Sequence, residues 1–466
     1  MARRWQVLLV ASAGAFMGFL DVTIVNIAFP AIERDFHGAS LAELSWILNA
    51  YAIVFAALLV PAGRIADRIG RRRGFVIGLV VFGLASALCA AAPSVELLVA
   101  ARVVQAAGAA FLVPTSLALL LPAFPLAQRA TAVGLWGATG AIAAATGPSL
   151  GGVLIDAGGW RWVFLVNLPL AVITLVGAYR ILVESREPEP TGRPDLLGSV
   201  MVAAGIGSLA LALVKGNAWG WGDVRTIAAF VLAAVLVAAV VWRSGRVAVP
   251  VVEPALLRVR AFAVANVGTL LFAASFYAML LGNILFLTQV WGYDVLQAGI
   301  AVTPGPLMAA VFAGPAGALA DRFGQRAVAV PGALLYSAGF VWYLTHAGAH
   351  PDYARDLLPG MLATGSGVGL TFPTLSSAAA ASLPPARFAT GSAIVSMTRQ
   401  VGAVLGIALL VVVLGTPHQT DPVTAFDHGW AFMLAGGLAT AVAALALGRV
   451  RAQVPAAAPQ PAEVSA

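Results

Sequence analysis

Three charged residues stand inside long apolar runs of the sequence, where charge is costly. Asp21 and Arg102 lie in two different runs near the N-terminus, and Arg399 lies in a third. A charged side chain well inside a bilayer costs about 3 kcal/mol on insertion scales. Asp21 is the only acid deep in such a run, and Gln105 follows Arg102 by about one helical turn. The carboxyl group of Asp21 can take up and release a proton, and a nearby arginine can change how readily it does so, so these residues are the first candidates for chemistry.

The depths of Asp21 and Arg102 are compatible with contact between them. At 1.5 Å per residue, Asp21 lies about 22 Å from one membrane face and Arg102 about 8 Å from the other. The two depths coincide in a slab of roughly 30 Å. Burial disfavours the charged form of a carboxyl group, and a nearby arginine favours it. The pair can therefore couple proton uptake and release to changes in exposure. A static ion pair that orients two helices is the alternative.

The composition defines the class of protein in which this chemistry is placed. Of 466 residues, 60% are hydrophobic and only 10% are charged, whereas soluble domains average about 25% charged residues. This excludes a soluble enzyme, a disordered chain and a secreted disulfide scaffold. The single cysteine, Cys89, allows no intrachain disulfide and no cysteine-based metal site. An all-α polytopic membrane protein remains.

Fourteen apolar stretches are long enough to cross a bilayer. Most arginines fall in loops on the side of the N-terminus, which predicts a multi-pass protein of the cytoplasmic membrane with both termini in the cytoplasm. The predicted spans are 7–30, 44–62, 74–92, 97–121, 130–154, 162–183, 196–215, 224–243, 262–288, 297–320, 327–347, 357–381, 388–414 and 427–447.

The two halves of the chain resemble each other. GRIADRIGRRR at 63–73 is echoed by GALADRFGQR at 317–326, Gly108 with Pro114 by Gly367 with Pro373, and Arg129 by Arg387. These echoes predict two six-helix bundles with an inserted pair of helices. The expected domains are a first bundle at 1–184, a linker with the inserted spans at 185–255, a second bundle at 256–448 and a disordered cytoplasmic tail at 449–466.

Several motifs resemble the major facilitator superfamily, in particular its fourteen-span branch of drug:proton antiporters. The loop at 63–73 resembles the loop signature of the superfamily. Arg102-Val-Val-Gln105-Ala-Ala-Gly108 resembles its Arg-x-x-Gln-Gly-x-Gly motif, with Ala106 in place of the first glycine. FLDVTIVNIAFP (19–30), SWILNAYAIVFAALLVPAGR (45–64), WRWVFLVNLP (160–169) and Arg399-Gln400-Val-Gly402 are similar to segments of that branch, and GPSLGG (147–152) is similar to the antiporter motif of exporters.

The resemblance implies the major facilitator fold and roles for named residues. In that fold two six-helix bundles rock about a site near the midplane. The resemblance adds a proton-handling role for Arg102 with Gln105. The loop motif, which is expected to act as a conformational latch, comprises Gly63, Arg64, Asp67, Arg68, Gly70, Arg71 and Arg72. In the antiporter motif Pro148 bends the helix, and Gly147, Gly151 and Gly152 permit close helix contact.

Polar and aromatic side chains within the runs are candidates for a substrate cavity, although for the aromatic ones an interfacial position is the alternative. Arg399 either attracts an anionic substrate or binds backbone carbonyls at a helix break near Gly402; the second use is favoured. The candidates are Asn26, Trp46, Asn49, Tyr51, Trp136, Tyr277, Asn283 and Arg399.

The sequence therefore favours a proton-coupled exporter of small organic molecules such as drugs or antibiotics. A symporter or facilitator for a metabolite is the alternative. An integral membrane enzyme is disfavoured because no His, Cys or acidic cluster has metal-ligand spacing and no phosphate loop is present. We expect no cofactor and no metal, with the proton gradient as the energy source. The expected partners are the substrate, protons and lipid but not nucleic acid, and the protein is expected to be monomeric.

Overall fold

The computed structural model describes residues 2–125, 128–186, 195–383, 388–415 and 422–447, and within these ranges every regular element is helical. The first part of the chain runs through long helices joined by short turns, and three short helices precede or follow them. They are α1 (Arg3–Asp35), α2 (Leu41–Leu44), α3 (Trp46–Ile69), α4 (Arg71–Ala91), α5 (Val95–Leu120), η1 (Leu121–Ala123), α6 (Arg129–Gly158), α7 (Trp162–Leu165) and α8 (Asn167–Ile181).

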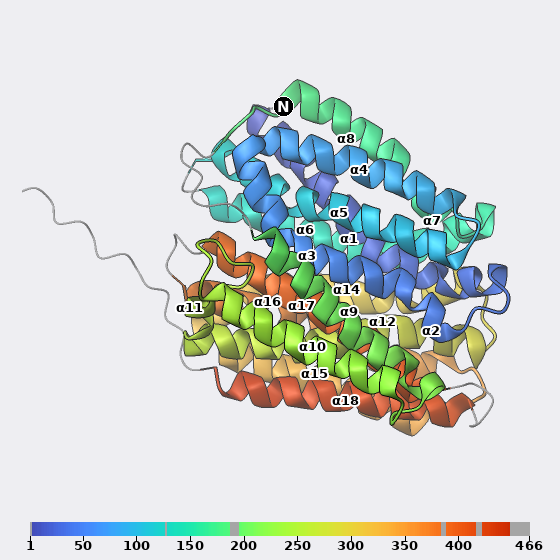
Figure 1. Cartoon of the computed structure of the whole chain (residues 1–466). Coiled ribbons are helices and arrows are strands. Elements are labelled where there is room, and N and C mark those ends of the chain that lie inside the picture. Colours follow the sequence, from blue (N-terminus) through green and yellow to red (C-terminus); the bar gives the residue numbers. More distant parts are fainter. Residues whose placement is uncertain (1, 126–127, 187–194, 384–387, 416–421, 448–466) are drawn as a thin grey trace, which may run out of the picture.

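The rest of the chain continues in the same way (Figure 1). Its elements are α9 (Leu196–Trp219), α10 (Val224–Ser244), α11 (Pro254–Leu257), α12 (Arg260–Gln289), α13 (Val295–Val302), α14 (Pro304–Phe323), α15 (Gln325–His346), η3 (Tyr353–Leu357), α16 (Leu358–Ala381), α17 (Phe388–Leu414) and α18 (Pro422–Leu445). The predicted tail at 449–466 lies outside the described residues, and so does Arg387. The domain boundaries remain predictions.

Thirteen stretches of the described chain are long and apolar enough to cross a membrane. They match thirteen of the fourteen predicted spans. The fourteenth, α16, is 24 residues long and packs against α14 and α15, but its glycines, serines and threonines make it less hydrophobic. The all-α polytopic membrane fold predicted from the sequence is confirmed.

The long helices form two groups of six. α1, α3, α4, α5, α6 and α8 pack on one another, and α12, α14, α15, α16, α17 and α18 form the second group, with α13 as the first part of its broken helix. Between α3 and α4 the chain turns at Gly70, whose φ of +117° favours glycine. Gly324, with φ +91°, makes the equivalent turn between α14 and α15. The two halves of the chain therefore share this glycine turn.

The inserted helices α9 and α10 join the two groups along one side. α9 packs on α3 and on α17, and α10 covers α9. Ile206 and Ala210 of α9 lie in one apolar cluster with Ile53 of α3 and Val404 of α17. The pair therefore closes a seam between the two groups.

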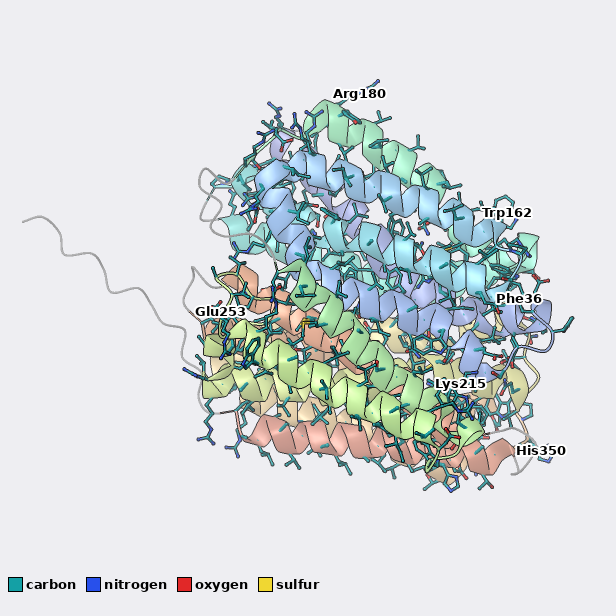
Figure 2. All side chains as sticks on the ribbon, viewed as in Figure 1. Phe36, Trp162, Arg180, Lys215, Glu253 and His350 are labelled. Atoms are coloured by element: carbon teal, nitrogen blue, oxygen red, sulfur yellow. The ribbon has the colours of Figure 1, made fainter. Side chains whose placement is uncertain are left out.

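Charged and aromatic side chains mark the two ends of the molecule. Figure 2 shows Glu253 at one end and Phe36 and His350 at the other. We call the end that holds Arg71, Arg72 and Arg73 the basic end; α1 begins and α18 ends there. We call the other the far end.

Two predicted spans differ from single straight helices. The span predicted at 297–320 is broken at Thr303 into α13 and α14, because Pro304 lacks the backbone donor that would continue the helix. The span predicted at 162–183 is divided into the short α7 and the longer α8.

Candidate functional site

Asp21 of α1 and Arg102 of α5 meet in the interior of the first group of helices. Arg102 Nη1 donates to Asp21 Oδ2 at 2.5 Å, and the two side chains are 1% and 0% exposed, respectively. A buried charge is tolerated only when it is paired and hydrogen-bonded. The contact expected from the two depths is present.

Gln105 completes a three-residue network with this pair. Its Nε2 donates to Asp21 Oδ1 at 2.9 Å, and its Oε1 accepts from Arg102 Nη1 at 2.6 Å. The spacing of three residues places Gln105 on the same face of α5 as Arg102. The carboxylate thus receives one hydrogen bond on each oxygen.

A second layer of side chains supports the network, and none of these side chains was predicted as a site residue. Ser86 Oγ of α4 accepts from Gln105 Nε2 at 2.8 Å and from Asn167 Nδ2 of α8 at 3.4 Å. Cys89 Sγ donates to Gln105 Oε1 at 3.6 Å. Asn167 stands in the WRWVFLVNLP motif, which was the available signal; Ser86 is not marked by any motif.

The positive charge of Arg102 is enclosed by α3. Arg102 Nε donates to the carbonyl of Ile47 at 3.1 Å, and its guanidinium lies 4.0 Å from the centre of the Tyr51 ring. A cation over an aromatic face is attracted by the ring quadrupole, more strongly when both are desolvated. Tyr51, predicted to line the cavity, instead covers the arginine.

Glycine in the motif around Arg102 lets α4 pack closely on α5, so that side chains of α4 can contact the network. A Cβ added at Gly108 would lie 2.6 Å from the backbone nitrogen of Phe82 and 3.0 Å from the carbonyl of Gly78. Small residues permit this close approach of helices. The approach places Ser86 and Cys89 of α4 within reach of Gln105.

A separate pocket lies between the two groups of helices. The space not filled by atoms measures about 650 Å³, part of it open to solvent. The wall combines residues of both groups, and none of the described residues that line it carries a charge. It is lined by Thr23, Asn26, Ala144, Pro148, Phe276, Met279, Leu280, Asn283, Ile284, Val302, Gly305, Pro306, Met361, Thr364, Gly365 and Val368.

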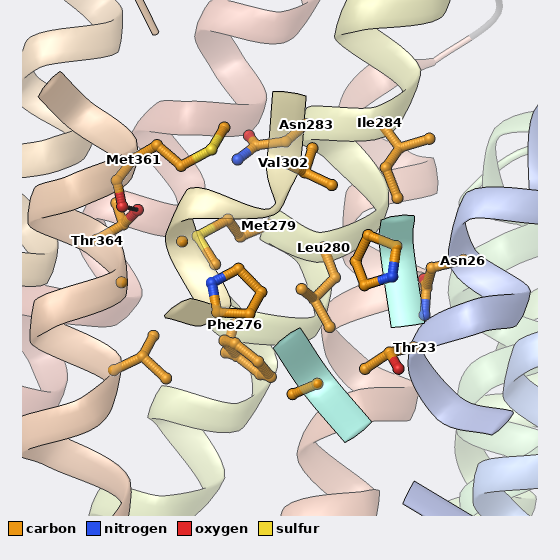
Figure 3. Close-up of a pocket in the computed structure, with 16 residues that line it drawn as sticks. Thr23, Asn26, Phe276, Met279, Leu280, Asn283, Ile284, Val302, Met361 and Thr364 are labelled. Atoms are coloured by element: carbon orange, nitrogen blue, oxygen red, sulfur yellow. Dashed lines mark hydrogen bonds between the residues drawn. The ribbon is translucent and has the colours of Figure 1, made fainter. Parts of the chain in front are cut away.

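Residues of α1 and residues of α16 lie on opposite sides of the pocket. Figure 3 shows Thr23 and Asn26 on one side and Met361 and Thr364 on the other, with Phe276, Met279 and Leu280 between them. Asn26 Nδ2 donates to the carbonyl of Val22 at 2.6 Å. Asn283 Oδ1 accepts from Trp430 Nε1 at 3.5 Å.

The antiporter motif forms part of this wall and fixes α6 to its neighbours. A Cβ added at Gly147 would overlap the Thr23 hydroxyl, and one at Gly151 would overlap Ile27. A Cβ at Gly152 would lie 3.1 Å from the Cα of Leu296, in α13. The motif therefore packs α6 against α1 of its own group and against α13 of the other.

Only two of the eight predicted cavity residues, Asn26 and Asn283, line the pocket. The other six predicted cavity residues do not line this pocket: Trp46, Asn49, Tyr51, Trp136, Tyr277 and Arg399. Trp136 donates to Ser116 Oγ at 3.0 Å, and Trp46 and Tyr277 pack on the cluster that joins α3, α9 and α17. Asn49 is completely buried in α3. The sequence shows polarity within a span but does not show the direction in which a side chain points.

Arg399 is half-buried in α17, and the helix break expected near Gly402 is absent because α17 runs unbroken over Phe388–Leu414. A Cβ added at Gly402 would lie 2.7 Å from the Leu270 carbonyl, and one at Gly406 would overlap the Ala274 backbone. These glycines serve close packing of α17 on α12.

The loop motif that was predicted to act as a latch forms its contacts within the first half of the chain. Asp67 accepts from Arg71 Nε at 2.8 Å. Glu184, beyond the end of α8, accepts from the backbone nitrogens of Arg72 at 3.1 Å and Arg73 at 3.3 Å. Its carboxylate thus caps the N-terminus of α4, and this contact was not predicted.

Comparison with known proteins defines the class. The sequence profile of the Major Facilitator Superfamily matches residues 11–253 and 265–465. The chain therefore belongs to this superfamily of membrane transporters, which are not enzymes.

Individual relatives are named as drug or antibiotic resistance proteins. The chain is 36% identical over 410 residues to "Multidrug resistance protein Stp" of Mycobacterium tuberculosis (strain ATCC 25618 / H37Rv), covering 87% of this chain and 75% of the relative. It is 33% identical over 446 residues to "Methylenomycin A resistance protein" of Streptomyces coelicolor, covering 95% and 91%. The fold matches a bacterial homologue of the human lysosomal transporter Spinster, solved inward-facing and unoccupied, with TM-score 0.67, 18% identity and 96% of each chain covered.

Proposed function

We propose that this protein exports small organic molecules, such as drugs or antibiotics, across the cytoplasmic membrane in exchange for protons. The observation that carries the proposal is the buried network of Asp21, Arg102 and Gln105 beside a pocket shared by the two groups of helices. The resistance names of relatives at 33–36% identity support export of such compounds. The basic end then faces the cytoplasm.

In this proposal the network binds and releases the proton that is exchanged for the substrate. Asp21 releases its proton when Arg102 is close, because the guanidinium stabilises the carboxylate. When α1 and α5 shift, the carboxyl group loses that partner and takes a proton from the side to which it is open. Neutralising Asp21 removes the attraction between α1 and α5, so the protonation state selects between two packings of these helices.

The structure is consistent with the cytoplasm-facing state of this cycle. At the far end Gln289 Nε2 donates to Glu33 Oε2 at 3.4 Å, and Gly152 packs on Leu296. These contacts join the two groups at the far end. The outward-facing state would require them to separate and the latch of Asp67 and its neighbours to take new partners.

The test is transport in everted vesicles energised by an imposed pH gradient, with a panel of uncharged antibiotics and cationic dyes. Wild type is compared with Asp21→Asn and Arg102→Ala, and with Glu96→Gln, which changes an exposed acid at the start of the same helix α5. Gradient-driven uptake should be lost in Asp21→Asn, with substrate binding retained, and unchanged in Glu96→Gln. Uptake that survives Asp21→Asn would exclude this site as the proton site.

A further inference from the structure

The pocket and the proton network use opposite faces of the same helix. Asp21 faces α5, where it meets Arg102. Thr23 and Asn26 follow it by two and five residues, which places them about 140–160° around the helix from Asp21. Both line the pocket between the two groups. The acid that carries the proton is therefore not part of the wall that contacts the substrate.

The wall offers a substrate no charge. Among the described residues that line it, the polar side chains are those of Thr23, Asn26, Asn283 and Thr364, and the apolar surface includes Phe276. Moving an ion from water to such a surface is unfavourable unless a counter-charge is present. Once Asp21 is protonated, the charge of Arg102 on the opposite side of α1 has no counter-charge. This net positive charge further disfavours a cation in the pocket.

The amides supply hydrogen bonds at two points of the pocket. Asn26 Oδ1 is buried and has no hydrogen-bond partner among the described residues, so it is available as an acceptor. Asn283 Oδ1 accepts one hydrogen bond from Trp430, and its amide nitrogen carries two N–H donors. The two amides belong to different groups of helices, so a molecule that binds both of them bridges the groups.

We infer that the substrates are electrically neutral, largely apolar molecules that carry a hydrogen-bond donor for Asn26 and an acceptor for Asn283. This inference rests on the proposed function, and it makes the two asparagines the specificity-determining residues. The proton and the substrate then act on each other through the position of α1 and do not compete for one carboxylate.

Thiol labelling tests the charge preference of the pocket without knowledge of the natural substrate. Met361→Cys places a thiol in the wall, and His350→Cys provides a matched thiol in an exposed loop at the far end. The probes are three methanethiosulfonates: a cationic trimethylammonium-ethyl, an anionic sulfonatoethyl and an uncharged benzyl reagent. Wild type measures the background from buried Cys89.

Relative to the loop thiol, the uncharged reagent should react with Met361→Cys at least about tenfold faster than either charged reagent. Adding Asn26→Asp should raise the rate of the cationic reagent over that of the anionic one. Asn283→Asp makes the same change from the other group of helices, so failure of one variant to fold leaves the other as a test. Asn217→Asp, in α9 and outside the pocket, should change neither the rate of the cationic reagent nor that of the anionic reagent.

Equal relative rates for the cationic and the uncharged reagent would overturn the inference. So would an unchanged charge preference in folded Asn26→Asp and Asn283→Asp. Neither result bears on the proposed function, because that depends on gradient-driven uptake and its loss in Asp21→Asn. Gradient-driven uptake restricted to cationic dyes would overturn the inference and leave the proposed function supported.

Discussion

The buried pair of Asp21 and Arg102 makes the stability of the protein sensitive to single changes. Removing one partner of a buried ion pair costs about 3–5 kcal/mol, because the remaining charge has no compensation. We expect Arg102→Leu to lose stability on this scale. Asp21→Asn combined with Arg102→Leu should recover most of it, since no buried charge remains.

The measurement is thermal unfolding in detergent, followed by tryptophan fluorescence for both single variants and the double variant. A double variant no more stable than Arg102→Leu would show that the arginine stabilises the protein chiefly through Ile47 and Tyr51. The opposite result would locate the coupling energy in the ion pair itself.

The central residues of the site could be predicted from the sequence, but their surroundings could not. Asp21 and Arg102 are conspicuous because charge is rare in apolar runs, and Gln105 shares the helix face of Arg102. Ser86 and Asn167 carry common polar side chains, and only the packing of α4 and α8 brings them to the network. Tyr51 was expected in the cavity because the sequence does not show which face of α3 meets Arg102.

At the scale of helices, Gly147 decides how closely α6 approaches α1. A methyl group there would overlap the Thr23 hydroxyl, whereas one at Gly137, in the same helix, would meet nothing within 4 Å. Overpacking of a filled interface costs about 1–3 kcal/mol. We expect Gly147→Ala to lower the unfolding temperature and to abolish transport, with Gly137→Ala close to wild type in both. Equal effects of the two substitutions would show that close packing at Gly147 limits neither stability nor transport.

The contact of Glu184 with α4 is a second device at this scale. Its carboxylate accepts from two backbone nitrogens that a helix start leaves without partners. Loss of a capping side chain costs about 0.5–2 kcal/mol. Glu184→Ala should therefore destabilise the protein by about this amount and increase hydrogen exchange at the first turn of α4. Hydrogen exchange unchanged in that turn would contradict the assigned role.

The helices themselves were the most predictable feature, because a span needs only length and hydrophobicity. Helix interruptions were not predicted correctly. Pro304 breaks a span beside the pocket, whereas Gly402 does not break α17, because the glycine is used for close packing on α12. A proline beyond the first turn of a helix always removes a backbone hydrogen bond, but the effect of a glycine depends on its neighbours.

At the scale of the whole molecule, a proton entering in exchange for a neutral substrate moves one net positive charge inward. If Asp21 is the proton site of the proposed exchange, we expect one proton per substrate. The exchange should then be driven by membrane potential as well as by the pH gradient. A potential of 100 mV supplies about 2.3 kcal/mol per charge, or a factor of about 50 in the accumulation ratio.

Proteoliposomes loaded with the pH-sensitive dye pyranine can measure this charge movement. The pH is equal on both sides, and a potassium gradient with valinomycin sets the potential. An uncharged substrate such as chloramphenicol should elicit a proton flux that increases with the potential and is absent in Asp21→Asn. A monovalent cation exchanged for one proton moves no net charge, so its flux would not respond to the potential. Substrate-dependent proton flux in wild type that is indifferent to the potential would show that the transported species carries a compensating charge, contrary to the uncharged wall around Asn26 and Asn283.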